Sequence, residues 1–254
     1  MNAMNLKSSK VSPVLVFSFI AFIFALFLGQ PAQAKSTVDI CKTGDVLYVW
    51  AKTGLNLRQE PSIHAKRLTI LLPGSSVKII GFTEKRYAIK TLRATEDETN
   101  PFVIKGNWVF VQVGDIQGFV LDTYLLPMET PKAGESMKHY LISMSEKVAA
   151  LGTEESESYS FSAHAKHNIS IQYESGEYYQ NITVTMPAFS IEDGFVFYNF
   201  FNDIQGRASS EDGEVYLFKN WATELSLFDE SAGEVSFQLI DGELVISEVM
   251  MDGC

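Results

Sequence analysis

Residues 234–249, EVSFQLIDGELVISEV, contain the clearest secondary-structure signal in this chain of 254 residues. Apolar and polar residues alternate on both sides of Asp241-Gly242, a dipeptide that suits the positive backbone angles of a two-residue hairpin turn. A third alternating run, 224–228, comes just before this hairpin. The three runs predict an antiparallel meander, so we expect an antiparallel sheet in the C-terminal half.

The remainder of the C-terminal half adds one helix and more strands. Apolar residues recur at helical spacing from Met137 to Leu151, and Gly152 follows as a stop, which predicts one amphipathic helix. Phe195–Phe201 has aromatic residues on both faces and predicts a strand buried on both sides, with a hydrophobic ligand groove as the alternative. Other strands are expected at 159–163, 169–173, 178–186 and 214–218. Residues 135–254 therefore predict an α+β domain, one helix plus an antiparallel meander sheet, in which we recognise no family.

The N-terminal half contains short strand-like runs bounded by turn residues, at 46–51, 55–57, 65–71, 76–82, 108–113 and 117–121. Five or six short strands without a long helix predict a small barrel, so the whole chain is expected to be mainly β. Residues 83–105, between the fourth and fifth of these runs, form a connection that is long for a compact domain. Alternation at 87–92 favours an extended hairpin there over a functional loop.

Several short motifs of this half occur in a familiar order. They are Leu55-Asn56-Leu57-Arg58 with Pro61-Ser62, Leu71-Leu72-Pro73-Gly74, Val77-Lys78-Ile79-Ile80-Gly81, Asn107-Trp108-Val109-Phe110-Val111, Gly118-Phe119-Val120 and Tyr124-Leu125. Together they resemble a bacterial SH3-like (SH3b) domain over residues 44–127, about a third of the chain. The chain departs from the family in two places. Gly118-Phe119 replaces the usual Gly-Trp, which keeps the aromatic bulk and removes an indole donor, and residues 83–105 are an insertion.

The resemblance implies a binding module directed at peptidoglycan or at protein partners, without catalytic activity. Aromatic residues on such barrels can line a shallow groove. The candidates for that groove are Tyr48, Trp50, Trp108 and Tyr124, with Asn56 and Arg58 as polar contacts. In a small barrel, an aromatic residue packs in the core more often than it contacts a ligand. A core role is therefore the alternative for these residues, above all for Trp108 and also for Phe119.

Residues 1–34 have the pattern of a secretory signal peptide. Lys7 and Lys10 precede an apolar run at 14–28, and Ala32-Gln33-Ala34 follows as a small-residue cleavage motif. The run is shorter than the roughly 20 residues that span a bilayer, so an uncleaved anchor is the weaker alternative. We expect a periplasmic or secreted protein with no stable membrane span after signal cleavage.

Charge is distributed unevenly along the chain. Residues 35–132 carry 13 basic and 10 acidic residues, whereas residues 133–254 carry 5 basic and 21 acidic residues, a net charge of −16. The change falls at 128–134, whose prolines and glycine predict a linker between the barrel and an acidic domain, 135–254. An acidic surface repels phosphate backbones, so a nucleic-acid partner is not expected.

The two cysteines, Cys41 and Cys254, lie near the two ends of the mature chain. An even number of cysteines in an oxidising compartment favours a disulfide, which here would close most of the chain into one loop. A free reactive thiol and an intermolecular bridge are the alternatives.

Few residues suggest catalysis or metal binding. His164 and His167 are weak candidates for a metal site, because positions three apart on one strand point to opposite faces. No nucleophile elbow, phosphate-binding glycine loop or HExxH helix is present. We expect no cofactor and no enzymatic activity.

The sequence as a whole therefore predicts a non-enzymatic envelope protein that recognises peptidoglycan or an envelope protein through its SH3b-like module. Two alternatives stay open. One is a periplasmic inhibitor or immunity-like protein whose acidic domain binds a basic target. The other is a cell-wall hydrolase with an unrecognised active site in the C-terminal domain.

Overall fold

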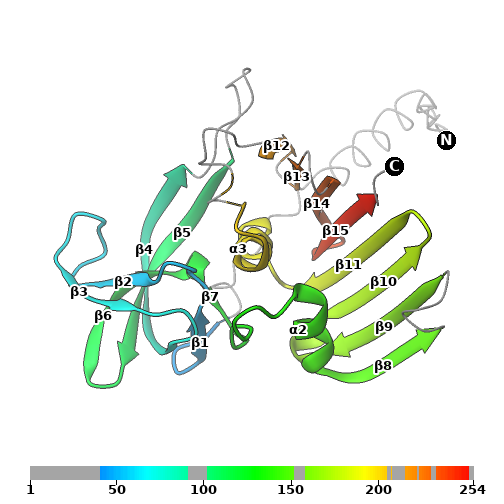
Figure 1. Ribbon diagram of the computed structural model, residues 1–254. Helices are drawn as coiled ribbons and strands as arrows, with labels where there is room; N and C mark the ends of the chain where they lie inside the picture. Colours follow the sequence, from blue (N-terminus) through cyan, green and yellow to red (C-terminus); the bar gives the residue numbers. More distant parts are fainter. Residues whose placement is uncertain are drawn as a thin grey trace, which may run out of the picture. The chain divides into compact units, whose positions relative to one another are not determined.

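A computed structural model describes residues 41–90, 102–151, 158–204, 207, 215–221, 223–229 and 233–251. These residues form two antiparallel sheets and two α-helices (Figure 1), so the predicted mainly β fold is confirmed. None of the described helices is long and apolar enough to cross a membrane. The signal segment, 1–34, lies outside the described residues.

The first sheet has seven strands in the order β3-β2-β6-β5-β4-β1-β7. Their bounds are β1 Val46–Val49, β2 Leu55–Arg58, β3 Arg67–Leu71, β4 Ser76–Lys90, β5 Val103–Val113, β6 Ile116–Leu121 and β7 Leu125–Leu126. The six runs expected from the sequence are all strands. Alternate residues fill a compact aliphatic core, and Val49, Leu57, Val109 and Val120 are completely buried in it.

Strands β4 and β5 are longer than the sequence predicted, because they continue into the insertion at 83–105. Ile89 pairs with Ile104, and Lys90 pairs with Val103. The two ends of the insertion thus form a hairpin, as the alternating pattern predicted. Residues 91–101 are outside the described part of the chain.

The second sheet has eight strands in the order β12-β13-β14-β15-β11-β10-β9-β8. Their bounds are β8 Ser145–Leu151, β9 Tyr159–Ala165, β10 Ser170–Gly176, β11 Tyr179–Pro187, β12 Val215–Trp221, β13 Glu224–Asp229, β14 Gly233–Ile240 and β15 Glu243–Met251. The predicted meander is confirmed as β13-β14-β15. Asp241 and Gly242 both have positive φ, 52° and 84°, as a two-residue hairpin turn requires.

The predicted helix 137–151 is wrong in its second half. Helix α2 covers Met137–Ser143 only, and the chain continues as strand β8. Val148 pairs with Ala163 of β9, so pairing with a neighbouring strand outweighs the helical spacing of the apolar residues. The apolar side chains of α2, Met137, Tyr140 and Leu141, are buried as predicted.

The predicted strand at Phe195–Phe201 is wrong, since these residues belong to a second helix, α3, Ile191–Asn202. Ser190 and Asp193 form a capping box at its start: the Ser190 hydroxyl accepts from the Asp193 N–H at 3.1 Å, and the Asp193 carboxylate accepts from the Ser190 N–H at 2.9 Å. The helix is apolar nearly all round because both sheets cover it. Phe195 contacts Phe102 of the first half and Phe237 of β14, at ring-centroid distances of 5.1 and 6.4 Å.

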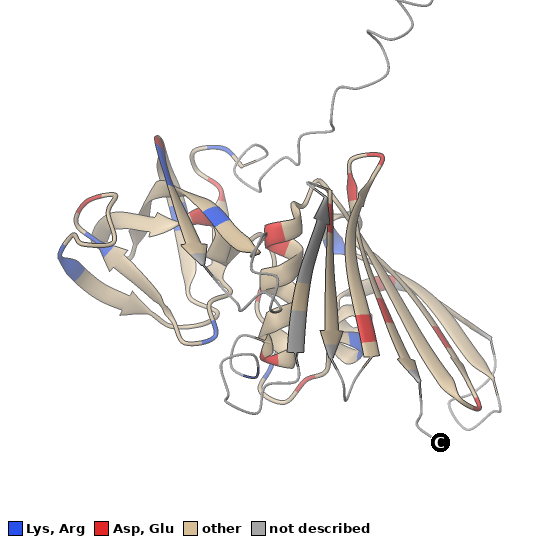
Figure 2. Cartoon of the chain, turned by 90° about the horizontal axis from the view of Figure 1, so that it is seen from above, with Lys and Arg blue, Asp and Glu red and all other residues tan. Residues whose placement is uncertain are grey.

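One continuous hydrophobic core joins the two halves of the chain. It contains the interior of the second sheet, both helices and five residues from the first half: Trp50, Phe102, Ile104, Leu126 and Met128. Met128, at the start of the predicted linker, is buried, and its carbonyl accepts the Trp50 indole N–H at 2.8 Å. The charge difference between the halves is visible in Figure 2, where Asp and Glu predominate on the second sheet.

Candidate binding pocket

A pocket of about 610 Å³ lies between the outer face of the first sheet and helix α3. The sheet contributes Asn56 and Arg58 of β2, Tyr87 and Ile89 of β4, Trp108 of β5 and Leu121 of β6. Helix α3 contributes Phe195, Val196 and Asn199. The volume is within the range of small-molecule and peptide sites, so this is the first place to look for a ligand.

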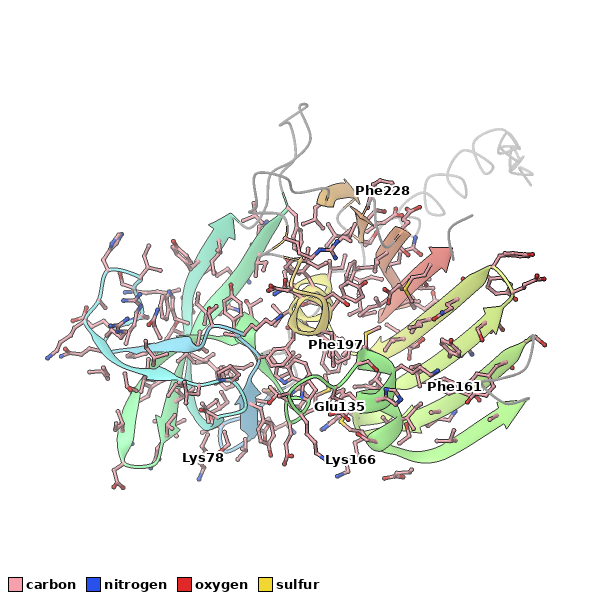
Figure 3. The ribbon with its side chains drawn as sticks, in the orientation of Figure 1. Lys78, Glu135, Phe161, Lys166, Phe197 and Phe228 are labelled. Carbon is pink, nitrogen blue, oxygen red and sulfur yellow. The ribbon has the colours of Figure 1, made fainter. Side chains whose placement is uncertain are left out.

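The floor of the pocket is made by two tryptophans that are almost inaccessible. Trp50 is 1% exposed and Trp108 is 3% exposed. Trp50 is surrounded by aromatic rings of the C-terminal half, among them Phe197 (labelled in Figure 3) and Phe200, at centroid distances of 5.4 and 5.1 Å. Both tryptophans line the pocket as the resemblance suggested, but their ring faces are used for packing and leave little surface for a ligand.

The polar side of the pocket comes from strand β2. Leu55 and Leu57 point into the sheet core, so Asn56 and Arg58 share the opposite face, which is the pocket wall. The Arg58 guanidinium donates from Nη1 to the Ala65 carbonyl at 2.8 Å. That bond holds the side chain in place, and a guanidinium has further N–H groups with which it can bind a carboxylate.

An ion pair lies at the rim of the pocket. Lys52 Nζ, from the β1–β2 loop, is 3.4 Å from Asp203 Oδ1, at the C-cap of α3. The two side chains are 41% and 55% exposed, so solvent screens the pair and its contribution to stability is within about 1 kcal/mol. Its position leaves one cation and one carboxylate next to any ligand in the pocket.

The extended β4–β5 hairpin closes the pocket on a third side. Tyr87 and Ile89 line it from β4, and both are partly exposed. The Thr83 hydroxyl donates to the Trp108 carbonyl at 2.7 Å, which fixes the base of the hairpin to the pocket floor. The insertion thus builds a wall, a role that the sequence pattern alone did not indicate.

Of the six groove candidates, the pocket brings together Trp50, Asn56, Arg58, Trp108 and Tyr124. Tyr48 is not part of the lining; its hydroxyl donates to Glu129 Oε1 at 3.5 Å. Sequence reasoning missed the pocket residues of α3, as well as Tyr87 and Ile89 of the hairpin and Lys52 at the rim. The Ser190-to-Asp193 spacing of a helix N-terminus was the signal that could have revealed α3.

A second pocket, of about 480 Å³, contains Cys41 and His167. Burial, and to a smaller extent the charge of Asp45, raises the pKa of the Cys41 thiol to about 11. A thiol with so high a pKa is protonated at neutral pH and is a poor nucleophile. The expected partner, Cys254, lies outside the described residues, so the disulfide stays a prediction.

The two histidines considered for metal binding are both exposed. His164 is on β9, and His167 is in the 3₁₀ turn Lys166–Asn168, where its φ is 62°. Partial burial of the ring lowers the pKa of His167, and the nearby charge of Lys166 lowers it further. In the part of the chain that the structure describes, no three His, Cys, Asp or Glu side chains gather in a way that could hold a metal ion.

Comparisons with protein-family models, with curated proteins and with solved structures gave no match.

Proposed function

We propose that this protein is a non-enzymatic peptidoglycan-binding protein of the bacterial envelope, periplasmic or secreted, and that the pocket between the first sheet and α3 is its binding site. The motif order over residues 44–127, which resembles an SH3b domain, and the secretory pattern of residues 1–34 motivate this proposal. The observation that carries it is the pocket itself, since five of the six groove candidates line one cavity of about 610 Å³.

The chemistry of the lining favours the stem peptides of peptidoglycan over its sugar chains. Stem peptides present amide groups and free carboxylates, which suit the Asn56 amide and the Arg58 guanidinium. Sugar rings are bound by stacking on exposed aromatic faces, whereas Trp50 and Trp108 are buried. Tyr87 and Tyr124, which line the pocket and are partly exposed, are the rings that can contact an apolar part of the peptide.

The residues that line the pocket are better suited to binding a ligand than to catalysing a reaction. Among the described residues that form it there is no histidine, cysteine or glutamate, and the carboxylate of Asp203 is paired with Lys52. Those residue types supply most general acids, general bases and nucleophiles. We therefore propose recognition of the cell wall as the function of the site.

Co-sedimentation with purified sacculi tests this proposal. The protein is used as residues 34–254, because these form one compact unit. We expect retention of the unaltered protein, reduced retention of Tyr87→Ala, and unchanged retention of the control Tyr178→Ala, whose ring is 65% exposed away from the pocket lining. Soluble stem peptides added in excess should lower this retention, because they compete for the pocket. Equal retention of both tyrosine variants, or no retention of the unaltered protein, would contradict the proposal.

A further inference from the structure

We propose that strand β3, at the end of the first sheet, binds an extended acidic segment of a partner protein as an additional strand. Within the described chain, the hydrogen-bonded neighbour of β3 is β2, and no strand follows β3 on its other side. An end strand presents a row of backbone N–H and C=O groups that can pair with another extended chain. This proposal concerns a surface outside the pocket and does not depend on peptidoglycan binding.

Three large apolar side chains are exposed on this strand and just after it. Leu68, Ile70 and Leu72 are 39%, 45% and 69% exposed, and they occupy alternate positions. Leu68 and Ile70 lie two apart on β3 and share a face, and Leu72 follows one residue beyond the end of the strand. Single exposed apolar residues are common on protein surfaces, but a row along an end strand is typical of a site that another chain covers.

The charges at the beginning of β3 indicate what that chain must carry. Arg67 is the register partner of Arg58 on β2, and like charges opposite each other on neighbouring strands are unfavourable. Lys66, next to Arg67, is also exposed. In the described part of the chain no carboxylate forms an ion pair with Lys66 or Arg67. Carboxylates on an incoming strand would relieve this repulsion.

The same cations argue against a second copy of this chain as the occupant. Basic residues on an end strand are a common protection against pairing with identical strands. Two β3 strands brought together would add Lys66 and Arg67 of both copies to one small surface, whereas an acidic strand would neutralise them. The favoured partner is therefore a different protein, with apolar residues at alternate positions and carboxylates beside them.

A peptide-display experiment tests this surface with a defined probe. A random library of dodecapeptides is selected on residues 34–254, and the enriched peptides are measured for binding to three proteins: the unaltered chain, Ile70→Lys and the control Ile116→Lys. Ile116 is a matched control, because it is 47% exposed on β6 of the same sheet and lies away from β3. We expect acidic peptides with alternating apolar residues, binding at least tenfold more weakly to Ile70→Lys and equally well to Ile116→Lys.

Amide hydrogen exchange shows how such a peptide is bound. Addition of a strand should slow exchange at backbone amides of Arg67–Leu71, whereas a contact through side chains only would leave them unchanged. The proposal is overturned if no such peptides are enriched, if Ile70→Lys binds them as well as the unaltered chain, or if β3 amides gain no protection. A dimer of the unaltered chain that Ile70→Lys abolishes would assign the surface to a second copy and would also overturn it.

Discussion

The indole of Trp50 packs against the ring of Phe197, with a centroid distance of 5.4 Å, and this contact joins the first sheet to helix α3. Trp50 follows strand β1, so it is anchored in the N-terminal half, whereas most of the rings around it belong to the C-terminal half. Its N–H bond to the Met128 carbonyl adds a polar contact at the same place. The pocket depends on this junction, because α3 forms one of its walls.

Replacement of Trp50 by alanine should destabilise both halves together. Removal of a fully buried tryptophan costs about 3–5 kcal/mol of unfolding free energy, and here the cavity would open inside the shared core. Urea unfolding followed by circular dichroism is expected to show one transition at a lower midpoint for Trp50→Ala. The control Tyr178→Ala should change the unfolding free energy by less than about 0.5 kcal/mol. Two separate transitions, only one of which moves in Trp50→Ala, would show that the halves unfold independently.

Glycine at position 106 is expected to be necessary for the fold of the first sheet. A Cβ atom at Gly106 would overlap the Thr123 hydroxyl and lie 2.8 Å from Asp122 Oδ1, both of which are buried. We predict that Gly106→Ala lowers the unfolding free energy by about 1–3 kcal/mol, as overpacking usually does. Gly81→Ala is the matched control, since the nearest atom to its Cβ is 3.6 Å away. Equal unfolding midpoints for the two variants would be inconsistent with this packing.

Strands were predicted better than helices. A strand with one buried face leaves an alternating apolar and polar pattern in the sequence, whereas a helix that is buried on several sides leaves no such periodic pattern. Strands such as β9 and β14, each with one buried face, show the expected period of two. Helix α3 packs against aromatic residues of both halves, Trp50 and Phe102 from the first and Phe237 from the second. Phe195–Phe201 is therefore apolar at almost every position and shows no helical period in the sequence. The pocket could be predicted only in part for the same reason: Asn56 and Arg58 follow from the pattern of β2, but the opposite wall is α3.

Asp122 should make the stability of the protein depend on pH in an unusual direction. Burial raises the pKa of its carboxyl, although hydrogen bonds from Asn107 and Thr123 partly oppose this shift. A group with a raised folded-state pKa stabilises the fold below its ordinary pKa of 3.8, and this contribution is lost as the pH rises through the folded-state value.

The variant Asp122→Asn isolates this effect, because asparagine keeps an acceptor oxygen and does not titrate. The unfolding free energy of the unaltered protein, relative to the variant, should be higher at about pH 3.5 than at about pH 7. Asp115→Asn, at an exposed position, serves as the control for general charge effects. If the unfolding free energy of the unaltered protein, relative to Asp122→Asn, is unchanged or falls on acidification, the pKa of Asp122 is not raised in the folded protein.

Cys41 should react slowly with alkylating reagents. With its pKa raised from 9.0 to about 11, the thiolate fraction near pH 8 is roughly 100-fold lower than for an ordinary thiol. The measurement is the rate of iodoacetamide alkylation in the variant Cys254→Ser, in which Cys41 is the one remaining cysteine of the chain. The same variant in denaturant gives the reference rate. If folded and denatured protein react at the same rate, the thiol is not shielded as described.

The most direct test of the proposed function is titration calorimetry of residues 34–254 with a soluble peptidoglycan stem peptide that has free carboxylates. Arg58→Ala removes the cation on the pocket wall, and Arg86→Ala removes an exposed arginine of β4 that does not line the pocket. A charged hydrogen bond contributes about 1.5–3 kcal/mol, so we predict roughly 10- to 100-fold weaker binding for Arg58→Ala and unchanged binding for Arg86→Ala. No binding by the unaltered protein, or equal losses in the two variants, would contradict the assignment of this pocket.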